Sequence, residues 1–362
     1  MRIFYDGFIF DFQQFGGINR YFNEIIARLP EDSHPIVSTF LGERHFWPTH
    51  RGRRIIRSRP FASMPSLSAL GRAWMSLRVA TAPVDVAHPT YFQRLTPGEL
   101  SRIGRPLVVT VFDMVHERFF DKSDPLGVVE AKRNYIEHAD AILCISEHTR
   151  EDMLNHFPQV EARTFVTPLG SSMNLSRATD YSLPDARPYF LYVGGRDGYK
   201  NFDVVLVALQ EFAERHADAL LRVVGSDWKA DEKRTIARLR LERNVVHEGR
   251  ADDDRLSSLY NRSIALIYPS LYEGFGIPLL EAMRCRTAVI CSRTSSLPEV
   301  GGEAPLYFDP RNADELCAQM EAIANSSSLR LECVARGLLQ ESKFSWDNTA
   351  ELTFAAYNRV VS

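Results

Sequence analysis

Short apolar runs rich in β-branched residues alternate with longer amphipathic stretches along most of the chain. The apolar runs at 106–113, 140–146 and 189–195 predict strands, and the amphipathic stretch at 127–139 predicts a helix. This strand–helix–strand order is typical of a parallel sheet with helices on both faces. Because parallel strands need long crossover connections, the alternation constrains the fold more than any other feature of the sequence.

The alternation is interrupted once, at 171–188, where Ser, Asp and Pro are frequent, and it then starts again. A polar stretch of this composition predicts a linker. With 362 residues the chain is long enough for two domains, each with its own core. We therefore predict an α/β fold of two doubly wound, Rossmann-like domains. Ligands in such sheets bind at the carboxyl ends of the strands, which would face the cleft between the domains.

Composition excludes several classes of protein. Lysine and arginine total 43 and aspartate and glutamate 46, so the formal net charge of -3 gives no general electrostatic basis for binding nucleic acid. The five cysteines stand in apolar stretches without C-x-x-C spacing, which predicts core residues of a reduced compartment and no zinc site or disulfide framework. No apolar run reaches the ~18 residues of a membrane helix and no signal peptide is recognisable, so we expect a cytoplasmic protein.

The sharpest motif, E-G-F-G-I-P-L-L-E, runs from Glu273 to Glu281 after an apolar run and opens a predicted helix. Its glycines let the backbone approach a ligand, and its proline suits the first turn of a helix. Amides at the start of that helix favour an anionic or hydroxyl-rich ligand, and the two carboxylates suit sugar hydroxyls. An ordinary strand–helix turn with surface acids is the alternative.

Two further loops carry chemistry suited to phosphates. Arg196 and Lys200 follow a Gly-Gly turn after the first predicted strand of the second half. Arginine holds phosphate bidentately and lysine acts as a point charge, so the pair suits a leaving diphosphate. Solvated loop cations are the alternative. Gly16 and Gly17, between the first strand and an amphipathic helix, occupy a position typical of a phosphate cradle.

Together these three motifs resemble those of the retaining glycosyltransferases of family 4, which have the GT-B fold. The resemblance runs from about residue 1 to 320 and is specific in the second half. It is closest to bacterial enzymes of surface-polysaccharide assembly, many of which are mannosyltransferases. It implies an N-terminal acceptor-binding domain at 1–172, with a C-terminal helix at 345–362 packing back on it, and a nucleotide-sugar-binding domain at 173–344.

The resemblance also implies roles for individual residues. Glu273 would hold hydroxyls of the donor sugar, while Arg196 and Lys200 would neutralise the leaving diphosphate without a divalent metal or other cofactor. The departing phosphate would accept the acceptor's proton in a front-face displacement, so no side-chain nucleophile is implied. Which of Leu279 and Leu280 packs on the nucleotide stays open. The implied donor contacts are Gly16, Gly17, Gly195, Glu248, Gly249, Gly274, Phe275, Gly276, Ile277, Leu279 and Glu281.

The first half departs from the family pattern at one position. Similar enzymes often carry a histidine in a T-x-H after this strand, whereas this chain has Phe112, followed by Asp113 and then His116. Asp113 could take over a contact to the donor sugar, and His116 could swing in from the next turn. Capping of its own turn is an equal alternative for Asp113. Ser146, after the next strand, is a candidate acceptor contact and equally a helix N-cap.

Two patterns bear on metals and membranes. The acids at 252–254 fit the D-x-D metal motif of another transferase architecture, but acids are favoured at a helix start, so we expect capping and no metal site.

The stretch 42–78 contains eight arginines, interleaved with aromatic residues, and one acid. It suits either a solvated loop or an anionic membrane surface at the inner face of the cell membrane, where a polyprenyl-linked acceptor would be met.

We therefore predict a retaining hexosyltransferase that acts on a glycan or lipid-linked glycan in surface polysaccharide biosynthesis, such as that of lipopolysaccharide. GDP-mannose is the leading donor, on the resemblance alone. A UDP-hexose-dependent transferase is the first alternative, because nothing in the sequence distinguishes guanine from uracil. A non-catalytic nucleotide-sugar-binding scaffold and a nucleotide-sugar epimerase are the others. A dehydrogenase is disfavoured, since neither glycine loop supplies G-x-G-x-x-G.

Overall fold

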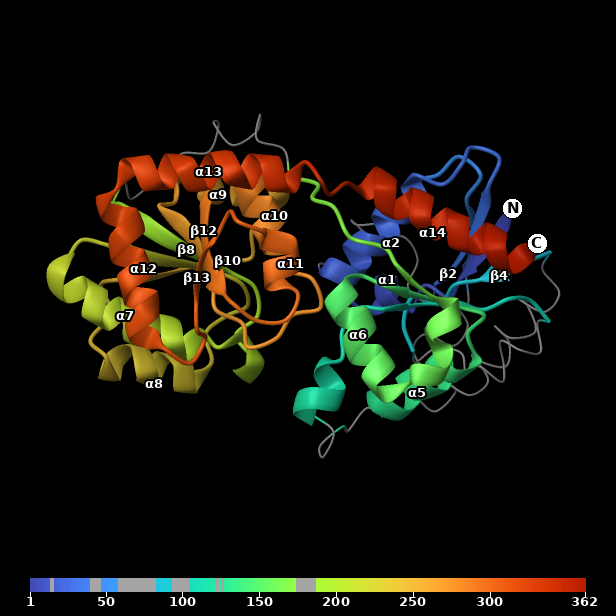
Figure 1. Ribbon diagram of the computed structural model, residues 1–362, viewed down its shortest axis with the longest axis horizontal. Coiled ribbons are helices and arrows are strands. Elements are labelled where there is room, and N and C mark those ends of the chain that lie inside the picture. Colours follow the sequence, from blue (N-terminus) through green and yellow to red (C-terminus); the bar gives the residue numbers. More distant parts are fainter. Residues whose placement is uncertain are drawn as a thin grey trace. The chain divides into compact units, whose positions relative to one another are not determined.

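The computed structural model describes residues 1–13, 16–39, 47–57, 83–92, 104–120, 124, 127–173 and 187–362. These residues form two compact units, Met1–Leu169 with Ser345–Ser362, and Gly170–Phe344. Each unit has a core of parallel strands covered by helices (Figure 1). The α/β fold class predicted from the alternation of strands and helices is confirmed.

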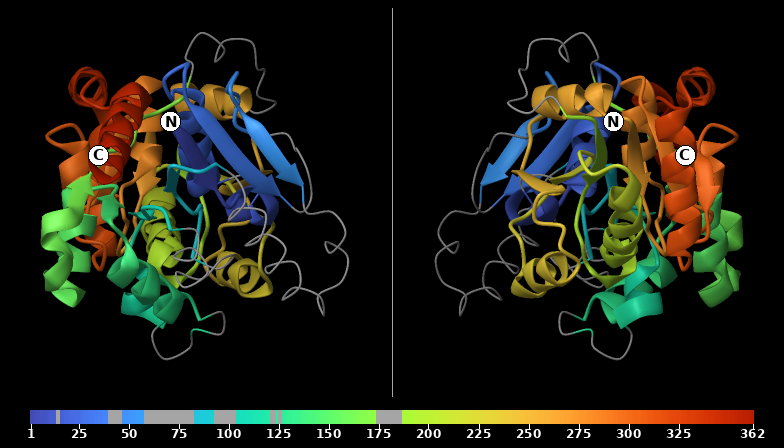
Figure 2. Two further views of the ribbon diagram at one scale, coloured as in Figure 1. Left: turned by 90° about the vertical axis from the view of Figure 1, so that its right-hand side faces the viewer. Right: turned by 90° about the vertical axis from the view of Figure 1, so that its left-hand side faces the viewer.

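The first unit is built on two groups of parallel strands, in the orders β3-β2-β1-β4 and β5-β6-β7. An isolated parallel bridge between Ala87 and Leu107 links the two groups. The arrows of β2 and β3 point the same way in Figure 2, as their parallel register requires. All carboxyl ends therefore lie along one edge, where α/β sheets bind ligands. The strands are β1 (Arg2–Tyr5), β2 (His34–Thr39), β3 (Arg54–Arg57), β4 (Val86–Ala87), β5 (Val108–Val111), β6 (Ala141–Cys144) and β7 (Thr164–Val166).

The helices of the first unit cover this sheet, and helix α14, from the C-terminal end of the chain, packs on α2. The short helix α1, which directly follows β1, was not predicted from the sequence. A π-helical turn at His116–Phe120 follows β5, and a 3-10 turn at Pro158–Arg163 follows α6. The helices are α1 (Phe8–Phe12), α2 (Gly17–Ala27), α5 (Val128–His138), α6 (Glu147–His156) and α14 (Trp346–Val361).

A buried chain of hydrogen bonds ties α14 to the sheet of the first unit. The Tyr357 hydroxyl lies 2.6 Å from His88 Nδ1 and 3.0 Å from the Tyr5 hydroxyl. His88 Nε2 lies 2.8 Å from the Thr110 hydroxyl on β5. Buried polar groups destabilise a protein when they lack partners, so these matched groups specify where α14 docks.

The buried His88 predicts a pH dependence of stability. Burial lowers the pKa of His88 to about 3, whereas a histidine in an unfolded chain titrates near ~6.5. As the pH falls below that value, the unfolded chain binds a proton that folded His88 does not bind, so the free energy of unfolding falls. We expect this residue to account for a loss of about 2 kcal/mol between pH 7 and pH 5. Urea unfolding of wild type and of His88→Gln at both pH values measures it, and an equal pH dependence in the two proteins would contradict it.

The second unit has one sheet of six parallel strands, in the order β10-β9-β8-β11-β12-β13. Helices α7, α8 and α12 share an apolar core with one face of this sheet. On the other face the Tyr189 hydroxyl donates to the carbonyl of Leu259 in α9, and α10 packs on α9 and α13 (Figure 1). The strands are β8 (Tyr189–Val193), β9 (Leu220–Val224), β10 (Val245–Gly249), β11 (Ala265–Tyr268), β12 (Ala288–Ser292) and β13 (Leu306–Phe308). The helices are α7 (Phe202–Arg215), α8 (Ala230–Arg238), α9 (Asp253–Arg262), α10 (Ile277–Arg284), α11 (Leu297–Gly301), α12 (Ala313–Asn325) and α13 (Ser327–Glu341).

Several composition-based expectations can be compared with the described residues. All five cysteines are buried and unbridged, which confirms them as core residues. Within the described parts of the chain, no helix combines the length and apolar character needed to cross a membrane. In the stretch 42–78, Trp47 is buried against Phe10, with the two ring centroids 5.0 Å apart, so this aromatic side chain belongs to the core. Most of that stretch, and of the predicted linker at 171–188, lies outside the described residues.

Candidate active site

The strand order of the second sheet reverses between β8 and β11. Ligands in α/β sheets bind beyond the carboxyl ends of strands at such a reversal. The chain leaves β8 into a 3-10 turn that ends at Lys200, and it leaves β11 into the loop that carries Glu273. Lys200 Nζ donates to Glu273 Oε1 at 2.7 Å and to Oε2 at 3.0 Å. The structure thus brings together two residues that the sequence analysis placed in separate motifs.

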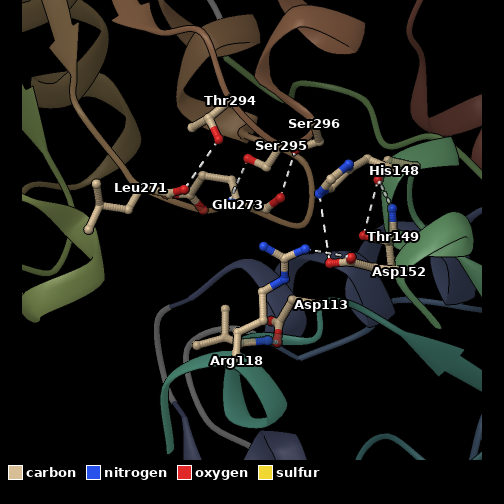
Figure 3. Close-up of polar contacts among 12 residues, drawn as sticks. Asp113, Arg118, His148, Thr149, Asp152, Leu271, Glu273, Thr294, Ser295 and Ser296 are labelled. Atoms are coloured by element: carbon tan, nitrogen blue, oxygen red, sulfur yellow. Dashed lines mark hydrogen bonds and ion pairs between the residues drawn. The ribbon is translucent and has the colours of Figure 1, made fainter. Parts of the chain in front are cut away.

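Serine hydroxyls anchor Glu273, which is 8% exposed. Ser270 Oγ donates to its carboxylate at 2.6 Å. The backbone amide of Glu273 donates to Ser295 Oγ at 2.9 Å, and its carbonyl accepts from Ser296 Oγ at 3.0 Å (Figure 3). No role in binding Glu273 was predicted for these serines, although the adjacent Ser295 and Ser296 after the neighbouring strand β12 are a signal in the sequence.

Tyr268, at the end of β11, adds a further donor to this group. Burial raises the pKa of Tyr268 well above its usual value. The charge of Glu273 and a hydrogen bond with it raise this pKa further. The phenol therefore stays protonated beside the Glu273 carboxylate. A carboxylate held by lysine, serine and tyrosine is a fixed acceptor, and fixed acceptors recognise sugar hydroxyls.

The glycine loop after Glu273 has the geometry expected of a close backbone approach. Gly276 has φ +105°, a conformation that favours glycine, and a Cβ there would lie 2.8 Å from Leu297 Cδ2, so that side chain would have to shift. Helix α10 begins at the next residue, Ile277, so its first amides are directed toward this edge of the sheet. The Phe275 ring is buried edge-to-face against Phe344 at 5.7 Å. The Phe275 side chain therefore belongs to the core, and its carbonyl accepts a hydrogen bond from Ser296 Oγ at 2.9 Å.

Within α10, Glu281 is 7% exposed and accepts a hydrogen bond at 3.0 Å from the hydroxyl of Tyr260 in α9. Tyr260 could not be identified from the sequence, because no local pattern links a residue of α9 to one of α10. Leu279 and Leu280 are both fully buried in this structure, so neither presents its side chain to solvent.

The Arg196 side chain contacts other partners than the Lys200 side chain does, so the shared role of the two cations at one diphosphate stays a prediction. The Arg196 side chain is 1% exposed. Its Nε donates to Glu232 Oε1 at 2.8 Å, and its Nη2 donates to the carbonyls of Ser226 and Asp227 at 2.8 Å and 3.0 Å. The guanidinium also lies 4.6 Å from the ring centroid of Trp228. Glu232 thus binds one side of this guanidinium, whose Nη1 is buried without a hydrogen-bond partner among the described residues, whereas Lys200 binds Glu273.

Glu248 also differs from its predicted role. Its carboxylate is 7% exposed and is bonded by Arg222 and Arg255. The side chain thus belongs to a buried ion-pair cluster, and its implied contact with the donor stays a prediction. Gly249, with φ +68°, ends β10, and its carbonyl accepts from the Gly225 amide. The carbonyl of Gly195 accepts from the Tyr192 hydroxyl at 2.6 Å.

In the first unit, the position of the missing histidine is filled by packing. Phe112 lies edge-to-face on Tyr21, with ring centroids 5.1 Å apart. Asp113 Oδ1 accepts from the amide of Val115 at 3.0 Å, which confirms the turn-capping alternative. His116 begins the π-helical turn and contacts the ring of Phe120 at 5.6 Å. The structure places Asp113 and His116 after β5, at the ligand-binding edge of the sheet.

Two helix caps were predicted and both are observed. Ser146 Oγ accepts from the Thr149 amide at 2.9 Å at the start of α6. Asp252 Oδ1 accepts from the Arg255 amide at 2.9 Å at the start of α9, so this acid caps a helix. In the described ranges, no group of three or more His, Cys, Asp and Glu side chains is arranged to hold a metal ion. Gly16 and Gly17 form the N-cap and first residue of α2.

Two family profiles match the chain, one in each unit. Residues 16–170 match the glycosyl transferase 4-like domain, and residues 178–339 match glycosyl transferases group 1. Each unit is thus similar to a domain of glycosyltransferases. Solved structures agree on the fold: sucrose-phosphate synthase from Thermosynechococcus elongatus has a TM-score of 0.80 at 19% identity, with 99% of this chain and 98% of that one covered. WaaG, a glycosyltransferase involved in lipopolysaccharide biosynthesis, has a TM-score of 0.73 at 17% identity, with 99% of each chain covered. The GT-B fold is thereby confirmed.

Curated relatives include several mannosyltransferases. The O-antigen chain mannosyltransferase B of Escherichia coli is 33% identical over 233 residues, which are 61% of each chain. A serotype-specific mannosyltransferase WbdA of Escherichia coli is 30% identical over 241 residues, 62% of this chain and 29% of the relative. The chain thus spans less than two thirds of the length of these relatives. The MMP alpha-(1->4)-mannosyltransferase of Mycolicibacterium hassiacum is 27% identical, with 77% of this chain and 71% of the relative covered.

Proposed function

We propose that this glycosyltransferase transfers mannose from GDP-mannose, with retention of configuration, to a glycan or polyprenyl-linked glycan acceptor in surface polysaccharide biosynthesis. The observation that carries the proposal is the Lys200–Glu273 pair, with Lys200 Nζ 2.7 Å from Glu273 Oε1, at the reversal of strand order in the second sheet. One group suits a departing diphosphate and the other a sugar hydroxyl, which are the two ends of a nucleotide-sugar donor. The relatives named as mannosyltransferases favour mannose.

In the proposed reaction the bond between the anomeric carbon and the diphosphate oxygen breaks on the face from which the acceptor hydroxyl attacks. The electron pair stays on the diphosphate, whose charge Lys200 and the amides at the start of α10 stabilise. The acceptor's proton passes to the departing phosphate. Glu273 holds hydroxyls of the donor sugar, and Glu281 binds the ribose. Because Lys200 supplies the compensating charge, we propose that no divalent metal is required.

The remaining proposed contacts come from side chains of the first unit and from backbone amides. Asp113 and His116 would contact the donor sugar, and Ser146 the acceptor. The glycine-rich segments would contribute amides: Gly16, Gly17, Gly195, Gly249, Gly274, Gly276 and the adjoining Ile277. We also propose action at the cytoplasmic face of a membrane, through 42–78. Co-sedimentation with liposomes that does not respond to anionic lipid content would remove this last point.

A UDP-hexose is the second candidate donor, because a solved structure with the same fold, HepE from Anabaena, is in complex with UDP and glucose. Thermal unfolding with GDP-, UDP-, ADP- and dTDP-sugars, without metal and then with magnesium, separates the two. A donor that binds only the folded state should stabilise it by about 2.7 kcal/mol at ~100 times its dissociation constant. Stabilisation by GDP-mannose alone, without metal, supports the proposal. Stabilisation by UDP-sugars only would mean that the donor is a UDP-hexose. Donor binding without any sugar transfer would indicate a non-catalytic scaffold.

A further inference from the structure

A second cluster of charged side chains lies in the first unit, at the carboxyl ends of β5 and β6. Arg118 belongs to the π-helical turn after β5, and His148 and Asp152 lie one turn apart in α6, which follows β6. Arg118 Nη2 donates to Asp152 Oδ1 at 2.8 Å, and His148 Nε2 lies 3.7 Å from Asp152 Oδ2 (Figure 3).

The pair combines an anchored carboxylate with an accessible guanidinium. The Asp152 side chain is 9% exposed, whereas that of Arg118 is 48% exposed. Asp152 Oδ2 is buried and accepts no hydrogen bond from the described residues. A buried carboxylate oxygen without a donor is costly, so this cluster can gain a hydrogen bond when a ligand or a small shift of His148 supplies one.

The surrounding charges indicate what kind of ligand fits. Lys132 Nζ donates to Glu117 Oε2 at 2.8 Å and to the Asp113 carbonyl at 2.9 Å, and its side chain is 4% exposed. Both cations of the cluster are therefore paired with carboxylates, so the local field does not favour a phosphate. A neutral ligand rich in hydroxyl groups fits better, because each hydroxyl donates to a carboxylate and accepts from arginine.

We infer that the Arg118–Asp152 pair, flanked by His148, binds neighbouring hydroxyl groups on a pyranose ring of the acceptor. Two adjacent hydroxyls offer a donor and an acceptor side by side, and this ion pair presents the complementary acceptor and donor in a fixed geometry. The inference rests on the proposed function and extends it, since it assigns a polar site on the first unit to a neutral sugar.

Direct binding of simple sugars tests the inference without knowledge of the natural acceptor. The probes are methyl α-D-mannopyranoside, methyl α-D-glucopyranoside and inorganic phosphate, followed by saturation-transfer NMR in the presence of GDP. We expect wild type to bind a pyranoside, and Arg118→Ala and Asp152→Asn to bind it roughly tenfold to a hundredfold more weakly. Monodeoxy analogues should localise the loss, because each variant should become insensitive to removal of the hydroxyl it contacts.

Arg150→Ala is the matched control. Arg150 lies on α6, as Asp152 does, and its guanidinium pairs with Glu161 at 2.9 Å, close to the 2.8 Å between Arg118 and Asp152. The pyranoside affinity of this control variant should equal that of wild type. If Arg118→Ala and Asp152→Asn unfolded at a lower temperature but bound the pyranoside as wild type does, the ion pair would be purely structural and the inference would be overturned. A wild type that binds neither pyranoside, or a site that binds phosphate through Arg118, would also overturn it. Donor stabilisation is measured separately, so absence of any nucleotide-sugar shift would remove the proposed function without deciding the sugar site.

Discussion

Replacing Lys200 by alanine is expected to lower turnover by roughly 10²- to 10³-fold, the loss found when one charge-stabilising donor is removed from an active site. The side chain is 20% exposed and bonds both oxygens of Glu273, so it lies where donor sugar and diphosphate meet in the proposed reaction. The effect should fall on kcat, because charge on the diphosphate grows only as the glycosidic bond breaks. Release of GDP from GDP-mannose, followed at saturating acceptor, measures it.

Lys229→Ala is the control for this prediction. Its ammonium bonds Asp197 at 3.0 Å in the same unit, but its side chain is 54% exposed. This variant should keep wild-type turnover, and Lys200→Arg should keep part of it because the charge remains. If Lys200→Ala turned over as fast as wild type while remaining folded, the proposed site would be wrong.

Replacing Arg196 by alanine is expected to act on stability first. The change would leave Glu232, itself 8% exposed, as a buried carboxylate without its guanidinium partner. Breaking a buried ion pair from one side typically costs about 3–5 kcal/mol. We therefore expect a clear loss in the free energy of unfolding, measured by urea titration. Any activity loss, measured well below the unfolding temperature, should be much smaller than that of Lys200→Ala.

The double variant Arg196→Met/Glu232→Gln separates the two interpretations of this arginine. It removes both charges at similar volume, so most of the lost stability should return. A single variant with unchanged stability but a turnover loss as large as that of Lys200→Ala would return Arg196 to the role first predicted, at the leaving diphosphate.

Much of the fold was predictable because its signals are local. The apolar run at 140–146 became β6, the amphipathic stretch at 127–139 became α5, and Ser146 caps α6 as expected. A strand's period and a helix cap depend on residues within a few positions of one another. Helix α1 was missed because its five residues, Phe8–Phe12, are too few to show a helical period.

The site was predictable only where the backbone itself makes the geometry. The glycine at 276 is favoured by its positive φ, and the motif around it indicated a turn that needs glycine. Partners of charged side chains were harder to predict. The Glu281 carboxylate is bonded by a side chain of α9, and the Glu248 carboxylate by one side chain of β9 and one of α9. No local pattern in the sequence indicates those contacts.

Local residue patterns specify the alternating α/β architecture, the helix caps and the glycine-rich loop that opens α10. Which charged side chains pair with one another depends instead on the packing of distant segments. Arg196 and Lys200 stand four residues apart, yet one is held by Glu232, 36 positions along the chain, and the other by Glu273, 73 positions along. The reason is physical: a long charged side chain is held by the nearest buried counter-charge, and the sheet order determines which counter-charge that is.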